Sequence, residues 1–365
     1  MAKPKLLIIA PCFGIGGPSN ALYFIKYLND YTKTLFPANP ILRASLINVE
    51  KALNTKIIVF NCKVNNYVMQ ALVRHVVDVY KPDYIISIAP ELLSLQNRRL
   101  LERTLVIPQG FLEPIIIRFK PLTMKALITY PEIYLVSRSV GAYAAISKYM
   151  YKRIVDVFKP KRIALIYNPV MEQYFQLGEE RIQRLSHPSK LRLLYVGRLE
   201  KLKGVHKLIE WFPSVLREFG DVSLHVVGSG GSLLNYLRHM IRRQDLSNRI
   251  FIHGFVNGSG LLEIYQHSNI LVTASYWESF CLPVAEAAAS AMPSVVREAF
   301  ALKEHIELGY AIGFSEDSGD AFVKAVGKVV DNYERLSHRA YSISRRLFYS
   351  SKVAERVSKI LKSLS

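Results

Sequence analysis

The sequence predicts an α/β protein with two domains, each built on a parallel sheet. Three observations support this fold class. The chain has 365 residues, which exceeds a typical single domain. Short apolar runs alternate with helical stretches in both halves. Half of the residues are hydrophobic and 21% are charged, the composition of a globular chain.

The first half opens with a buried-type strand that runs into the glycine-rich loop Gly14–Asn20. Ser19 replaces the third glycine of a dinucleotide fingerprint and Asn61 replaces its acidic residue, so a dehydrogenase is disfavoured. The expected strands are Lys5–Pro11, Lys56–Phe60, Pro82–Ile88, Thr104–Gln109, Ile133–Ser137, Ala142–Ser147 and Ile163–Tyr167. The expected helices are Ala21–Leu28, Tyr67–Tyr80, Leu92–Glu102 and Leu122–Thr129.

The first domain is expected to cover residues 1–170, and the polar stretch Gly178–Ser189 is expected to link it to the second. The second domain would cover 171–347, and residues 348–365 would form a closing helix whose apolar stripe needs a partner. Strands are expected at Leu191–Gly197, Ser223–Val227, Ile250–Ile252 and Ile270–Thr273. Helices are expected at Val205–Phe219, Leu233–Gln244, Leu261–His267 and Val284–Met292.

The stretch Tyr276–Glu286 carries the most informative pattern. Pro283 suits the first position of a helix, so Glu286 would lie near the opening turn and Glu278 in the loop before it. The backbone N–H groups of Phe280, Cys281 and Leu282 would face the same opening. Such a helix start binds a phosphate, and carboxylates accept hydrogen bonds from hydroxyls. A phosphate beside hydroxyls indicates a nucleotide-sugar.

Two further groups follow strands of the same domain. Arg198 and Lys203 come after Leu191–Gly197, where cations are well placed to bind a diphosphate. The glycine-rich turn that contains Gly230 follows the next strand and permits close approach of backbone to a ligand. Alone, each group is more typical of an ordinary surface, and together they favour a ligand site.

These motifs occur in order: Val196-Gly-Arg-Leu with Lys203-Gly204, Val227-Gly-Ser-Gly230, Phe251–Val256 and Glu278–Glu286. Together they resemble the retaining glycosyltransferases of family 4 (glycosyl transferases group 1). The resemblance covers the whole second domain, and the first through its glycine loop and its strand–helix alternation. It implies the GT-B fold, with two Rossmann-like domains facing across a cleft and a closing helix that crosses back to the first.

The resemblance also implies roles. Arg198 and Lys203 would bind the diphosphate, and Glu278 would contact the donor sugar beside the N–H groups of Phe280, Cys281 and Leu282. Glu286 would bind the ribose, Phe255 and Val256 the base, and Gly16 and Gly17 the phosphates or the acceptor. The expected reaction is transfer of a hexose from a nucleoside diphosphate to an acceptor hydroxyl with retained configuration. No cofactor or metal is expected.

Two residues depart from the family pattern. Cys281 stands where glycine is usual, and Gln109 follows the strand after which the family often has a histidine. Gln109 is expected to replace that histidine as a hydrogen-bond donor to the sugar. The same departures motivate an alternative, a catalytically weak nucleotide-sugar-binding protein of the same fold.

The positive charge is concentrated in one half of the chain. Of the net charge of +19, residues 1–170 contribute +14, with 23 Lys and Arg against 9 Asp and Glu. Such a surface attracts a polyanion or an anionic membrane. Because no nucleic-acid-binding motif accompanies it, nucleic acid is not expected. We expect a cytoplasmic protein, peripheral at the membrane, whose acceptor is a lipid-linked glycan or glycolipid; an ordinary solvated surface is the alternative.

Overall fold

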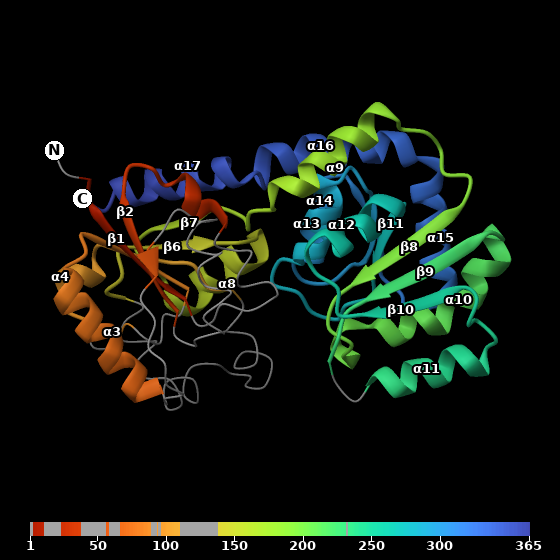
Figure 1. The fold of residues 1–365 in the computed structure, drawn as a ribbon, viewed down its shortest axis with the longest axis horizontal. Coiled ribbons are helices and arrows are strands. Elements are labelled where there is room, and N and C mark those ends of the chain that lie inside the picture. The colour runs from red at the N-terminus through yellow and green to blue at the C-terminus, as the bar shows by residue number, and fades with distance from the viewer. Residues whose placement is uncertain are drawn as a thin grey trace. The chain divides into compact units, whose positions relative to one another are not determined.

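The computed structural model describes residues 3–10, 23–37, 56–57, 66–88, 93, 96–109, 138–230 and 233–365 (Figure 1). The chain divides into two compact units. Residues 1–169 and 350–365 form the first, and residues 170–349 form the second. In the described part of the chain, no helix has the length and apolar character needed to cross a bilayer.

The first unit contains a parallel sheet with strand order β3-β2-β1-β4-β5-β6-β7. Its strands are β1 (Lys5–Ala10), β2 (Thr32–Pro37), β3 (Lys56–Ile57), β4 (Tyr84–Ser87), β5 (Thr104–Val106), β6 (Ala142–Ala145) and β7 (Ile163–Leu165). Its described helices are the 3-10 helix η1 (Tyr23–Tyr27), α3 (Asn66–Tyr80), α4 (Arg98–Leu101), α8 (Lys148–Phe158) and α17 (Ser350–Lys362).

The central strand β1 is an apolar run because both of its faces are buried. Its residues 6–9 are fully buried, as expected of an inner strand in a parallel sheet. β2 and β4 pair on either side of β1. The glycine loop Gly14–Asn20 that follows it, with Gly16 and Gly17, lies outside the described residues, as do the expected helix Leu122–Thr129 and strand Ile133–Ser137.

The last helix, α17, belongs to the first unit. It packs against η1 and β5, and its apolar stripe, which includes Val353, Val357 and Leu361, is buried. Arg356 donates a hydrogen bond from Nη1 to the carbonyl of Ile166 over 3.0 Å. The partner that the stripe requires is therefore the surface of the first unit.

The second unit contains a parallel sheet of order β10-β9-β8-β11-β12-β13. The strands are β8 (Leu191–Val196), β9 (Val222–Val227), β10 (Ile250–Gly254), β11 (Ile270–Thr273), β12 (Ser294–Arg297) and β13 (Ala311–Phe314). The helices are α9 (Glu172–Gln183), η3 (Lys201–Lys203), α10 (Val205–Phe219), α11 (Leu233–Arg243), α12 (Gly258–His267), α13 (Leu282–Ala289), α14 (Leu302–Glu307), α15 (Gly319–Asp331) and α16 (Tyr333–Leu347).

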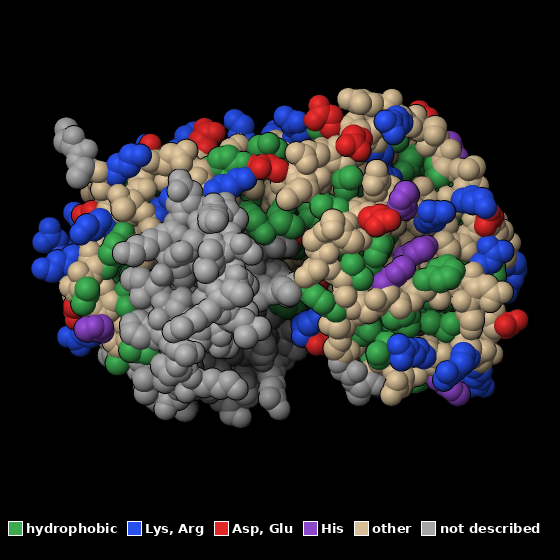
Figure 2. Space-filling model, in the orientation of Figure 1, with side chains coloured by type: hydrophobic (Ala, Val, Ile, Leu, Met, Phe, Trp, Pro, Cys, Tyr) green, Lys and Arg blue, Asp and Glu red, His purple; other side chains and the backbone are tan. Residues whose placement is uncertain are grey.

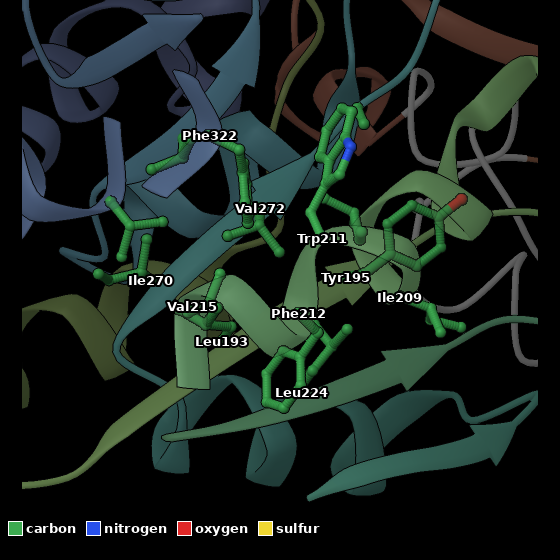
Figure 3. Close-up of a cluster of buried hydrophobic side chains, with 14 of the residues drawn as sticks. Leu193, Tyr195, Ile209, Trp211, Phe212, Val215, Leu224, Ile270, Val272 and Phe322 are labelled. Atoms are coloured by element: carbon green, nitrogen blue, oxygen red, sulfur yellow. The ribbon is translucent and has the colours of Figure 1, made fainter. Parts of the chain in front are cut away.

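The core of this unit lies between the sheet and α10, α11 and α15. Leu193, Tyr195 and Leu224 of the strands lie in one buried cluster with Trp211 and Phe212 of α10 (Figure 3). On the other side, α13 packs against α9 and α16, and these helices lie opposite α10 and α11 in Figure 1. The sheet is therefore covered on both faces, which explains its apolar strands.

The expected link at Gly178–Ser189 is wrong for much of its length, because α9 extends to Gln183. The exposed face of α9 is polar, so the amino-acid composition of this helix resembles that of a linker. Its other face buries Tyr174 and Phe175. At Gly178 a Cβ would stand 2.0 Å from the carbonyl oxygen of Ala289, so α9 and α13 approach too closely for a side chain at that position.

The strand order creates a switch point between β8 and β11, which are neighbours in the sheet but distant in the sequence. From β8 the chain moves outward to β9 and β10, then returns past β8 to β11, β12 and β13. The loops that leave the carboxyl ends of β8 and β11 therefore diverge to opposite faces. Ligands of open α/β sheets bind in the crevice that such a divergence creates.

Candidate functional site

Two loops of the second unit meet at this switch point. The first leads from β8 to α10 and carries Arg198 and Lys203. The second leads from β11 to α13 and carries Glu278. The two segments are far apart in the sequence, and the pairing of β8 with β11 makes them neighbours.

Backbone contacts tie the two loops together. The N–H of Tyr276 donates to the carbonyl of Leu202 over 2.9 Å. Gly204, with φ of +68°, lies so close to the second loop that a Cβ there would stand 2.1 Å from the carbonyl oxygen of Ala274. Because glycine alone tolerates both the positive φ and this approach, Gly204 fixes the spacing of the loops.

Lys203 and Glu278 form an ion pair between the loops. The ammonium nitrogen lies 2.7 Å from Oε1 of Glu278, and the two side chains are only 15% and 14% exposed. Both were candidate site residues, and the structure brings them into direct contact. Partial burial strengthens their attraction relative to an exposed pair.

Tyr195 and Cys281 lie beside this ion pair. Burial raises the pKa of the Tyr195 hydroxyl well above its usual value, and the negative charge of Glu278 raises it further. The pKa of the Cys281 thiol is also raised well above its usual value, first by burial and then by Glu278, with a smaller contribution from Glu286. The thiol is therefore protonated at neutral pH and is near both candidate glutamates.

Glu286 is on α13 and is 5% exposed. Its Oε2 accepts a hydrogen bond of 3.0 Å from the hydroxyl of Tyr265, a fully buried residue of α12. Burial, followed by the charge of Glu286, raises the pKa of Tyr265 well above its usual value, so this hydroxyl remains a donor. Glu286 thus offers little open surface to a ligand in this structure.

The start of α13 has an unusual backbone conformation. The helix begins at Leu282, one residue before Pro283, and Cys281 caps it in the left-handed conformation with φ of 69° and ψ of 76°. The expectation that Pro283 occupies the first helical position is therefore off by one residue. Within the described part of the chain, the N–H groups of Cys281 and Leu282 meet no acceptor. Phe280 is buried.

The other expected residues follow neighbouring strands of the same sheet. Arg198 is 66% exposed and forms an ion pair with Glu200. Gly230 follows β9 with φ of +104°, Phe255 follows β10 and is 52% exposed, and Val256 beside it is half-buried. Since β10, β9, β8 and β11 are neighbouring parallel strands, these residues and Glu278 all lie at the carboxyl ends of the strands, on the same side of the sheet.

In the first unit, Gln109 follows β5 and exchanges two hydrogen bonds with Asn168. Gln109 Nε2 donates to Asn168 Oδ1 over 3.2 Å, and Asn168 Nδ2 donates to Gln109 Oε1 over 2.9 Å. Because both amides are engaged in this pair, the orientation of Gln109 is fixed from its own unit. Gly16 and Gly17 lie outside the described residues.

Arg297, at the end of β12, supports the loop before Glu278, and the sequence pattern did not identify it. Its guanidinium lies 4.3 Å from the ring centre of Tyr276 and donates to the carbonyl of Ala274 and to Asp317. Burial would raise the pKa of Asp317, but hydrogen bonding and charge from Arg297 outweigh it and lower that pKa. A basic residue that ends an apolar strand is the only signal that the sequence offered.

The described residues contain no group of three or more His, Cys, Asp or Glu side chains arranged to hold a metal ion. The arrangement at the switch point instead combines a cation, two carboxylates and backbone N–H groups. A cation with N–H donors suits a phosphate, and carboxylates suit hydroxyls.

Residues 178–346 match the family model of Glycosyl transferases group 1. The second unit is a glycosyl transferases group 1 domain. The family resemblance predicted from the motifs is therefore confirmed for this unit. The match begins within α9 and ends within α16, so it covers both loops of the switch point.

Curated relatives align with part of the chain. An uncharacterized glycosyltransferase of Methanocaldococcus jannaschii is 29% identical over 171 residues, 44% of this chain and 43% of that protein. The serotype-specific mannosyltransferase WbdA of Escherichia coli is 32% identical over 149 residues, 40% of this chain and 18% of the relative. The aligned regions thus span less than half the length of these relatives.

Solved structures match the fold over the whole chain. HepE from Anabaena, in complex with UDP, has a TM-score of 0.77 at 15% identity and covers 98% of this chain and 100% of that one. A glycosyltransferase from Rickettsia africae has a TM-score of 0.74 at 16% identity and covers 100% and 99%. The predicted fold class, GT-B with two parallel-sheet α/β domains, is confirmed.

Arg297→Met should lower the free energy of unfolding of the second unit by about 2–3 kcal/mol. The change leaves the buried carbonyl of Ala274 without its donor and removes a hydrogen bond to a charged partner. Asp317→Asn is the matched control and should cost about 1 kcal/mol, because Arg297 keeps its bond to Ala274. Urea unfolding of the full chain measures both. An Arg297→Met variant as stable as the parent would contradict a supporting role.

Proposed function

We propose that this protein transfers a hexose from a nucleoside-diphosphate-sugar to an acceptor hydroxyl with retained anomeric configuration. The observation that carries the proposal is the Lys203–Glu278 ion pair at the switch point of a glycosyl transferases group 1 domain. The fold neighbour HepE is described in complexes with UDP and with UDP-glucose, which supports a nucleotide-sugar donor.

Each side chain then has a role that follows from its chemistry. Lys203 and Arg198 bind the diphosphate and stabilise the charge on the leaving group, with the N–H groups of Cys281 and Leu282 as further donors. Glu278 accepts hydrogen bonds from the sugar. Glu286 accepts from the ribose after a small shift from its buried position. Gly230, Phe255 and Val256 line the region of the nucleoside.

The reaction needs no nucleophile from the protein. The anomeric C–O bond to the diphosphate breaks, and the acceptor oxygen attacks the same face of the sugar. The departing diphosphate takes the proton of the acceptor hydroxyl, so atoms and charge balance. Electrostatic stabilisation of the diphosphate by Lys203 and Arg198 is the protein's main contribution. When a diphosphate engages Lys203, its partner Glu278 becomes available to the sugar hydroxyls.

The acceptor is proposed to be a glycan or glycolipid at an anionic membrane surface. The support is the charge of the first unit, where Lys and Arg side chains gather around α4 (Figure 2). Lys81, Arg98 and Arg99 are among the exposed cations there. Each basic residue near an anionic bilayer contributes about 1 kcal/mol to binding at low salt, so a group of them yields measurable association.

Donor turnover is the first test. A panel of UDP-, GDP- and ADP-sugars should contain one that binds and slowly releases its nucleoside diphosphate, and Lys203→Met should reduce that rate about 100-fold or more. Glu278→Gln should reduce it similarly. Glu263→Gln, an exposed charge removal on α12, is the matched control and should leave it unchanged. Binding without release, even with acceptors supplied, would favour a catalytically weak binding protein.

Turnover should not depend on a divalent metal ion. The proposed site neutralises the diphosphate with Lys203, Arg198 and backbone N–H groups, so no bridging cation is required. Initial rates measured in EDTA should therefore equal those in Mg²⁺ or Mn²⁺. Loss of activity in EDTA that added metal restores would overturn this part of the proposal.

Membrane association is tested by sedimentation with vesicles. The protein should pellet with vesicles of phosphatidylserine and phosphatidylcholine at 50 mM salt and be released as salt is raised, because screening weakens exposed charges. The double variant Arg98→Gln/Arg99→Gln should pellet less. Neutral phosphatidylcholine vesicles are the control. Equal recovery with neutral and anionic vesicles would contradict an electrostatic surface.

A further inference from the structure

His305 connects α14 to the loop that follows Glu278. It is 2% exposed. Its Nε2 lies 2.6 Å from the carbonyl oxygen of Phe280, and its Nδ1 contacts the hydroxyl of Tyr310. The ring also packs against the rings of Phe280 and Phe348. No part of the proposed chemistry uses this imidazole, although it touches the residue directly before Cys281.

The two contacts define the protonation of the imidazole. A carbonyl oxygen only accepts hydrogen bonds, so Nε2 must carry a hydrogen and donate to Phe280. In the neutral ring, Nδ1 is then an acceptor and receives the hydrogen of the Tyr310 hydroxyl. Burial lowers the pKa of His305 to about 4, which keeps the ring neutral at physiological pH. The carbonyl of Phe280 thus fixes the tautomer, and the Tyr310 hydroxyl satisfies the unprotonated Nδ1.

The carbonyl that His305 holds belongs to the peptide group between Phe280 and Cys281. This group is planar and trans, so its C=O and N–H point in opposite directions. Fixing the carbonyl of Phe280 toward α14 thus aims the N–H of Cys281 away from α14. That N–H meets no acceptor among the described residues. Lys203 and Glu278 are close enough to influence the thiol of the same residue.

The conformation that His305 holds is strained. Cys281 has φ of 69°, which disfavours any residue with a side chain. Rotating the Phe280–Cys281 peptide by half a turn would bring φ of Cys281 into the ordinary extended region. The same rotation would turn the Cys281 N–H toward α14 and break the bond to His305. The histidine therefore opposes a relaxation that would remove one N–H donor from the helix start.

We propose that His305 is a positioning residue that holds the Phe280–Cys281 peptide with its N–H aimed at the diphosphate of the donor. The proposal rests on the proposed function for the identity of the ligand, while the orientation of the peptide can be tested without any ligand. Tyr310 satisfies the other ring nitrogen of His305. Neither residue contacts the reacting atoms.

The orientation is measured first. Labelling with ¹⁵N-cysteine gives amide resonances for only three residues, Cys12, Cys62 and Cys281, and Cys281→Gly identifies the third. His305→Leu should shift the Cys281 resonance, because the peptide loses its donor and rotates. His305→Gln should leave the resonance near its parent position, since its amide donates to Phe280 and its carbonyl accepts from Tyr310. An unmoved resonance in His305→Leu would overturn the proposal.

Ligand binding is measured next, by calorimetry with UDP and GDP on the same variants. His305→Leu should weaken binding of the preferred diphosphate about tenfold to a hundredfold, the loss expected for one hydrogen bond to a charged group. His305→Gln should restore most of it. Tyr310→Phe is the control for stability alone, because it leaves a buried nitrogen unsatisfied yet keeps the bond to Phe280. Equal loss of affinity in Tyr310→Phe and His305→Leu would overturn positioning.

A double variant separates strain from packing. Glycine adopts positive φ without strain, so Cys281→Gly removes the reason for the peptide to rotate. In the Cys281→Gly background, His305→Leu should weaken binding less than in the parent background. Equal weakening in both backgrounds would refute the strain argument. If the parent chain binds no diphosphate while His305→Leu still shifts the Cys281 resonance, the proposed function fails and the orientation by His305 stands.

Discussion

The candidate site depends on the backbone contact between the β8–α10 and β11–α13 loops. The hydrogen bond from Tyr276 to Leu202 and the close approach at Gly204 set the distance between Lys203 and Glu278. If the loops separated, the ammonium and the carboxylate would each be left partly buried without a partner, which is costly. The ion pair therefore follows from the backbone contact, and the sheet order that makes the loops neighbours is what allows it.

The Lys203–Glu278 pair is better explained by ligand binding than by stability. Placing two charges in a partly buried site costs hydration energy that their attraction only partly offsets. In proteins generally, replacing a buried ion pair by apolar side chains of similar size often leaves stability unchanged or raises it. As a pair, however, the two groups hold each other in position until an anion competes for the ammonium and hydroxyls compete for the carboxylate. A nucleotide-sugar supplies both kinds of competitor in one molecule.

The sequence predicted the elements of the second unit closely where the local pattern was strong. The strand Ile270–Thr273 and the helix Val205–Phe219 have the predicted bounds. Lys203 and Glu278 were candidates, but their contact was not predicted, because strand order is not encoded in local periodicity. The second half of α9, from Gly178 to Gln183, was mistaken for part of a linker, since its exposed polar face dominates its composition. The conformation of Cys281 also left no signal, because cysteine has no preference for positive φ.

Two residues that follow the β11–α13 loop in the sequence hold it near both of its ends. These contacts explain how the strained conformation of Cys281 persists. Arg297 binds the carbonyl of Ala274 before Glu278, and His305 binds the carbonyl of Phe280 after it. Both donors come from elements that follow α13, and both bind backbone oxygens. Strain at a non-glycine residue persists only where the surroundings over-determine it, and it concentrates at functional sites. Cys281 meets the first condition, because the carbonyl of the preceding residue, Phe280, is held from α14. The second condition is met if its N–H binds the diphosphate, as we propose.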